Sequence, residues 1–154
     1  MLEKIISGGQ TGVDRAALDV ALDNGIPHGG WCPRGRKAED GTVPARYHLD
    51  ETPAEDYSIR TAWNVRAADA TLILTRGRPD GGTALTLRLA RDAGKPCLLV
   101  DLSEETADPA AVAEWLTQNR IRVLNIAGPR ESKQPGIYAD TCGFLERLFD
   151  EFYG

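Results

Sequence analysis

The sequence predicts a single α/β domain of the Rossmann-like type, in which helices cover both faces of a doubly wound, mostly parallel β-sheet. Short apolar runs alternate with longer amphipathic stretches, which is the order expected of strands joined by helical crossovers. Two glycine pairs also stand between an apolar run and an amphipathic stretch, where parallel sheets bind their ligands. Since no linker or low-complexity segment divides the chain, residues 1–154 are expected to form one ligand-binding domain.

The elements follow from these periods in chain order. Apolar runs that are too short for helices predict strands at Leu2–Ser7, Ala70–Thr75, Cys97–Leu102 and Arg122–Ala127. Helical periodicity predicts helices at Thr11–Asn24, Ser58–Ala67, Thr83–Ala93, Pro109 to about Asn119, and Pro135–Phe152. Gly25 and Gly94 suit the position just after a helix. Residues 28–53, rich in glycine, proline, arginine and aspartate, are expected to form a long functional loop with at most a short strand.

Composition excludes several classes of protein. A net charge of −5 argues against a nucleic-acid binder, which would present a basic face. The chain has no run of 18 apolar residues, so we expect no membrane association. The three cysteines lack the spacing of a disulfide framework or a zinc site, and a reducing cytoplasm is the expected compartment.

The first glycine turn follows the first predicted strand. Glycine lets the backbone take positive φ and lets a ligand approach closely, and free N–H groups at a helix start attract anions. The turn and the residues just after it are therefore expected to bind an anion. The candidate residues are Gly8, Gly9, Gln10, Thr11, Gly12, Asp14 and Arg15. A tight turn without a ligand, and a carboxylate placed at Asp14 only by the helix dipole, are the alternatives.

The second glycine turn, Gly81-Gly82-Thr83, repeats this layout and is expected to hold a neighbouring oxyanion. Thr83 either contacts that ligand or caps its helix. Arg130 and Ser132 follow the last strand at the same edge, and Arg34 and Arg36 belong to a basic stretch. Arginine suits bidentate recognition of oxyanions, so Arg34 and Arg130 are expected to close over the charge. Exposed loops with solvated charges are the alternative for both segments.

Several separated motifs together resemble the molybdenum-cofactor carrier family, over nearly the whole chain. They are Ser7–Leu18, Gly30–Arg36 with Ala38–Gly41, Arg60-Thr61 with Asn64-Val65, Asp80–Thr83, and Gly128–Ser132. That family is similar to a branch of the Rossmann-like superfamily that includes the lonely-guy phosphoribohydrolases and DNA-processing protein A. The resemblance implies a homo-oligomeric carrier, a tetramer or a dimer. It would hold molybdenum cofactor (molybdopterin), or a related phosphate or oxyanion ligand, without chemistry.

One departure from the superfamily bears on catalysis. The phosphoribohydrolases carry a catalytic glutamate three residues after the threonine of their glycine motif, where this chain has Thr86. A hydroxyl cannot replace a carboxylate that holds charge or transfers a proton. We therefore expect a binding protein with no catalytic or metal-ligating residues. A nucleoside-monophosphate hydrolase that uses Asp14 or Asp80, and a nucleotide-sensing module, are the alternatives.

Overall fold

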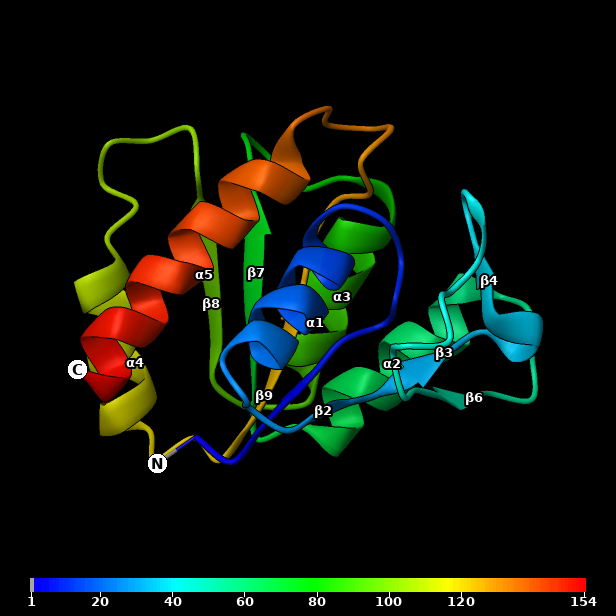
Figure 1. Cartoon of the computed structure of the whole chain (residues 1–154), viewed down its shortest axis with the longest axis horizontal. Helices are drawn as coiled ribbons and strands as arrows, with labels where there is room; N and C mark the ends of the chain where they lie inside the picture. The colour runs from blue at the N-terminus through cyan, green and yellow to red at the C-terminus, as the bar shows by residue number, and fades with distance from the viewer. Residues whose placement is uncertain (1) are drawn as a thin grey trace.

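A computed structural model describes residues 2–154 as a five-stranded sheet with helices packed around it (Figure 1). The strand order is β2-β1-β9-β7-β8, and every neighbouring pair is parallel. The strands of this sheet are β1 Lys4–Ile6, β2 His28–Gly29, β7 Ala70–Thr75, β8 Cys97–Asp101 and β9 Val123–Ala127. This is the Rossmann-like α/β class that the sequence predicts.

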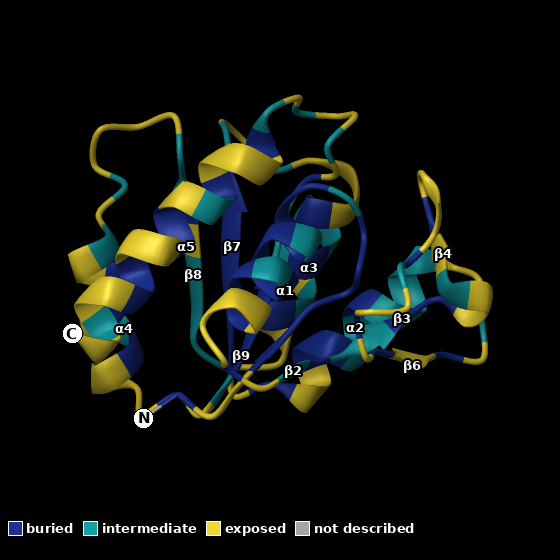
Figure 2. Cartoon of the chain, viewed as in Figure 1, coloured by how far each residue is buried: buried dark blue, intermediate teal, exposed yellow. Residues whose placement is uncertain are grey.

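Four α-helices connect these strands, and a fifth, α5, follows the last strand. Helix α1 packs against α5, α5 packs against α4, and α2 packs against α3. The helices are α1 Val13–Asp23, α2 Tyr57–Ala67, α3 Gly81–Asp92, α4 Pro109–Gln118 and α5 Ile137–Tyr153. All residues of β7 are buried, as expected of a strand covered on both faces (Figure 2). None of the helices in residues 2–154 is both long and apolar enough to cross a bilayer.

The predicted helices and strands are confirmed, with shifts of at most two residues at their ends. Gly25 and Gly94 follow α1 and α3 with φ of 66° and 68°, the left-handed conformation that ends a helix. Thr83 does not cap α3, because the helix begins at Gly81 and its N-cap is Asp80. The capping alternative for Thr83 is therefore wrong, and the hydroxyl lies inside the first turn.

The expectation of a long loop at residues 28–53 is wrong in its detail. Strand β2 forms an edge of the main sheet, and four further two-residue strands pair locally. These strands are β3 Trp31–Cys32 with β6 Asp50–Glu51, and β4 Lys37–Ala38 with β5 Gly41–Thr42. Strands of two residues are too short to leave a period in the sequence, so only the turn residues were visible there. We call residues 31–53 the flap.

The flap has a small core of its own, separate from the core under the main sheet. Its members are Leu18, Cys32, Ala38, Val43, Tyr47 and Leu49. Arg36 holds the backbone of the flap together. Its guanidinium donates hydrogen bonds to the carbonyls of Val43, Pro44, Tyr47 and Leu49. The flap is thus folded onto α1 through Leu18 rather than free in solvent.

The strand order places a topological switch beside β9. The chain runs from β1 to the edge strand β2, crosses to β7 and β8, and returns to fill the position between β1 and β7. The carboxyl ends of β1, β7 and β9 therefore lie at one edge of the sheet. In open parallel sheets, ligands bind at this kind of place.

Candidate functional site

A cleft of about 300 Å³ lies at this edge. It is lined by residues that follow β1, β7 and β9 and by the first turns of α2 and α3. The residues that line it include Asp14, Arg60, Gly82, Thr83, Arg130 and Lys133. A larger cavity of about 530 Å³ lies near Leu2 and Phe149, and none of the described residues that line it is basic. The smaller cleft, by contrast, combines basic side chains with the carboxyl ends of three parallel strands.

Asp14 and Arg60 form a buried ion pair at this cleft. The Arg60 Nη1 donates to Asp14 Oδ2 at 2.9 Å, and the two side chains are 14% and 4% exposed. Asp14 Oδ2 also accepts from the backbone N–H of Gln10 at 3.2 Å. Burial raises the pKa of Asp14 above its ordinary value, although Arg60 and the Gln10 N–H act in the opposite direction. The Arg60 Nε is buried and has no hydrogen-bond partner.

The first turns of two helices border the cleft. Asp56 caps α2 by accepting from the Ser58 N–H at 2.8 Å, whereas the side chain of Asp80 makes no such bond at α3. A Cβ atom built at Gly82 would meet nothing within 4 Å, so the backbone there is open to the cleft. The uncapped start of α3 leaves N–H groups available to an anion.

Two further cations stand at the mouth of the cleft. The Lys133 Nζ donates to Asp80 Oδ1 at 2.8 Å, and the Arg130 Nε lies 3.4 Å from Glu39 Oε2. Their side chains are 39% and 42% exposed, so both have room to turn toward a bound molecule. Each cation of the site, Arg60 included, is thus paired with a carboxylate of the chain itself.

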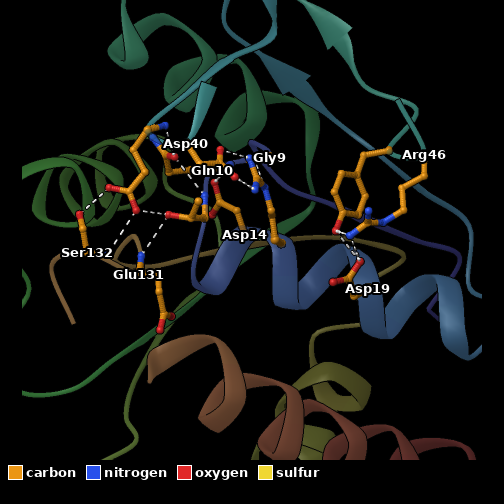
Figure 3. A network of polar contacts seen from close by, with 12 residues as sticks. Gly9, Gln10, Asp14, Asp19, Asp40, Arg46, Glu131 and Ser132 are labelled. Atoms are coloured by element: carbon orange, nitrogen blue, oxygen red, sulfur yellow. Dashed lines mark hydrogen bonds and ion pairs between the residues drawn. The ribbon is translucent and has the colours of Figure 1, made fainter. Parts of the chain in front are cut away.

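The tip of the flap binds back across the first glycine turn (Figure 3). Glu39 accepts from the hydroxyls of Thr11 and Ser132 and from the Ser132 N–H. Asp40 pairs with Arg15, whose Nη2 lies 2.7 Å from Asp40 Oδ1. The Gln10 Oε1 accepts from the backbone N–H of Glu39 at 2.9 Å. The two carboxylates of the tip are therefore held by residues at the start of α1 and in the loop after β9.

The glycines of the first turn pack closely against protein atoms. A Cβ atom at Gly8 would meet the Arg60 guanidinium, and one at Gly9 would lie 2.8 Å from Leu49 Cδ1. At Gly12 it would lie 2.4 Å from the carbonyl oxygen of Pro129. Gly9 and Gly12 both have φ of 79°. Glycine is needed at these positions for the approach of the flap and of the loop after β9.

The other predicted site residues fall into three groups. Gln10, Asp14, Gly82, Thr83 and Arg130 line the cleft. Thr11, Arg15, Gly81 and Ser132 lie beside it, where they contact the flap tip or Lys133. Two arginines lie apart from it: Arg36 is taken up by carbonyls of the flap, and Arg34 is exposed with Nη1 3.5 Å from the Pro53 carbonyl oxygen.

Reasoning from the sequence missed Arg60 and Lys133 as candidate site residues. Arg60 lies on a helix 46 positions after Asp14, so no local motif joins the two. The dipeptide Arg60-Thr61 is one of the motifs that resemble the molybdenum-cofactor carrier family, and this was the only feature of the sequence that pointed to Arg60. Lys133 extends the segment of Arg130 and Ser132 by one residue, and its position opposite Asp80 could not be read from spacing.

The whole chain was compared with known proteins. The model of the circularly permutated YpsA SLOG family matches residues 5–149. No curated protein matches the chain. A crystal structure of a "putative molybdenum carrier protein" from Syntrophus aciditrophicus is 50% identical, with a TM-score of 0.91, and the alignment covers 96% of this chain and 94% of that one. Because the family model spans nearly the whole sequence, this protein belongs to the circularly permutated YpsA SLOG family.

Proposed function

We propose that this protein is a carrier that binds molybdenum cofactor, or a closely related phosphate-bearing molecule, in the cleft at the carboxyl ends of β1, β7 and β9. One observation supports the proposal above all. Arg60, Arg130 and Lys133 converge there with the uncapped start of α3. Cationic donors and free helix N–H groups are the usual partners of phosphate in proteins.

The residues present fit a phosphate group. The buried Arg60 Nε lacks a partner, and the open backbone at Gly82 leaves room for an oxygen atom beside α3. Arg60, Lys133 and the N–H groups of Gly82 and Thr83 would hold the phosphate, and Arg130 would cover it. When bound, the cofactor supplies the dithiolene sulfurs that ligate molybdenum, and the protein's part is to bind and shield it. The volume of about 300 Å³ lies at the lower end for ligand pockets, so part of the ligand would extend beyond the cleft.

The comparisons support this ligand class. The Syntrophus protein is described as a "putative molybdenum carrier protein" and is 50% identical to this chain over the aligned residues. We extend that description here as a proposal, together with a homo-oligomeric state.

Asp14 favours a second candidate function, hydrolysis of a nucleoside monophosphate. It lines the cleft, and burial raises its pKa, as a general acid requires. Its ion pair with Arg60 and the hydroxyl of Thr86 count against this function, since Thr86 only donates to the Gly82 carbonyl oxygen at 3.0 Å.

The decisive experiment identifies what the protein carries. Mass spectrometry of protein purified from a host that makes molybdenum cofactor should find a phosphate-bearing pterin bound to the wild type. The Lys133→Ala variant should lose most of it, whereas Arg147→Ala, which changes an exposed residue on α5, should retain it. A wild-type protein that carries no anionic molecule and binds neither molybdate nor phosphate would refute the proposal.

A further inference from the structure

Glu39 is held in the way in which proteins hold a bound oxyanion. Its two carboxylate oxygens accept from two hydroxyls and one backbone N–H, and the Arg130 guanidinium lies 3.4 Å away. Its side chain is only 21% exposed although it stands at the tip of a hairpin. Burial acts to raise the pKa of Glu39, but the bonds from Ser132 and Thr11 outweigh it and hold the pKa below the ordinary value.

These donors come from parts of the chain that meet at the edge of the cleft. Thr11 belongs to the turn after β1, and Arg130 and Ser132 belong to the loop after β9. Arg130 also lines the cleft itself. The set of donors therefore adjoins the proposed phosphate site and shares a cation with it.

From this geometry we infer that Thr11, Arg130 and Ser132 form a second oxyanion subsite, which the chain's own Glu39 fills until a ligand displaces it. The subsite takes a tetrahedral oxyanion, either a free one such as molybdate or phosphate or the esterified phosphate of a larger ligand. The inference rests on the proposed function, because it describes how access to the same cleft is regulated.

The tip of the flap, residues 37–42, is attached separately from its base, so the tip can detach from the first glycine turn while the base remains packed on α1. Beyond Glu39, the tip is attached by the pair of Asp40 with Arg15 and by the bond from the Glu39 N–H to Gln10. The base is anchored separately by the flap core and by the bonds of Arg36 to carbonyls. Release of the hairpin residues 37–42 breaks mainly polar contacts, because Ala38 is the one residue among them that belongs to the flap core. The contact of Lys37 Nζ with the Tyr57 ring, 5.0 Å from its centroid, is lost as well.

The test compares Glu39→Ala with Asp40→Ala by calorimetric titration with inorganic phosphate, molybdate and a nucleoside monophosphate. Both variants remove one negative charge from the same turn, but only the first vacates the subsite. Glu39→Ala should tighten binding roughly 5- to 30-fold, the effect of removing an internal competitor held by charge-assisted bonds. Asp40→Ala removes one partly exposed ion pair that attaches the tip but leaves Glu39 in the subsite. Because such a surface pair contributes little at physiological salt, this variant should tighten binding by less than about twofold.

Adding Ser132→Ala to Glu39→Ala should cancel the gain, because the subsite then lacks a donor. Tighter binding of the free oxyanions alone, or of the nucleoside monophosphate alone, tells which source the subsite takes.

Four results would overturn the inference, and the last two tell its failure from that of the proposed function. Equal affinities of Glu39→Ala and Asp40→Ala would show that charge alone matters. Faster hydrogen exchange in residues 37–42 of Glu39→Ala without tighter binding would show that Glu39 only holds the flap tip in place and competes with no ligand. If the wild type binds oxyanions and Lys133→Ala weakens that binding while Glu39→Ala does not strengthen it, the proposed function stands and the subsite falls. If no variant binds any of the three probes, both fall.

Discussion

Replacing Arg60 by alanine should destabilise the protein, and increasingly so as the pH rises. At 2.9 Å, with an effective dielectric constant of about 20, the pair with Asp14 is worth about 6 kcal/mol before the cost of burial is counted. The loss of unfolding free energy cannot exceed the cost of protonating the Asp14 carboxyl, which Arg60→Ala leaves without its partner. Protonating a group of ordinary pKa 3.8 costs about 5 kcal/mol at about pH 7.5, and about 2 kcal/mol at about pH 5.5. We therefore expect a loss of about 3 kcal/mol at the higher pH and at most about 2 at the lower.

The sign follows from the direction of the pKa shift of Asp14. The folded pKa lies above the unfolded one, so this group's contribution to stability is complete below the unfolded pKa and is lost as the pH rises through the folded pKa. Removing Arg60 raises the folded pKa further, because the opposite charge is gone. The added loss of stability therefore appears on the alkaline side.

Urea unfolding at the two pH values measures both effects. Arg66→Ala, at an exposed position of the same helix, is the control and should stay within about 0.5 kcal/mol. Asp14→Asn added to Arg60→Ala should recover at least about 1.5 kcal/mol at the higher pH, since no carboxylate is left unpaired. A loss that is independent of pH, or a double variant no more stable than the single one, would refute the reasoning.

Further predictions concern the ligand. Arg130→Ala should weaken oxyanion binding by about 1.5–3 kcal/mol in calorimetry at two salt concentrations, and a loss of a few tenths would make Arg130 a solvated surface residue. Gly82→Val should abolish binding without unfolding, because its side chain enters open space, as chromatography and calorimetry would show. Gly9→Val should instead lower the unfolding free energy by more than about 2 kcal/mol, because of its φ and the contact with Leu49. A panel of nucleoside monophosphates should yield no free base; turnover that disappears in folded Asp14→Asn would establish the hydrolase instead.

The sequence predicted the frame of this fold because each helix, and each strand of the main sheet except the two-residue β2, carries its own signal. The run Ala70–Thr75 is apolar throughout, and Gly25 and Gly94 mark helix ends by a conformation that few other residues adopt. Register and strand order have no such local signal. The position of β9 between β1 and β7 became visible only in three dimensions.

The candidate site was predictable only in part, for a related reason. Glycine turns can be recognised locally, but what lies against a glycine cannot. The sequence does not tell that Gly9 faces Leu49 of the flap rather than open space. Likewise, the sequence does not distinguish an arginine that binds backbone carbonyls from one that is available to a ligand. Arg36 and Arg60 differ in their partners, and those partners are distant in sequence or belong to the main chain.

Arg36 gives the segment of residues 43–49 an unusual freedom in composition. The guanidinium recognises main-chain oxygens, which every amino acid supplies, so the outward-facing positions Ala45, Arg46 and His48 are under no constraint from this bonding. The spacing of the oxygens around one planar group is constrained, however. Homologues should therefore vary in residue type at Ala45 and His48, and less at Arg46, which also pairs with Asp19 and lies over the Tyr47 ring. Insertions and deletions between Val43 and Leu49 should be rare.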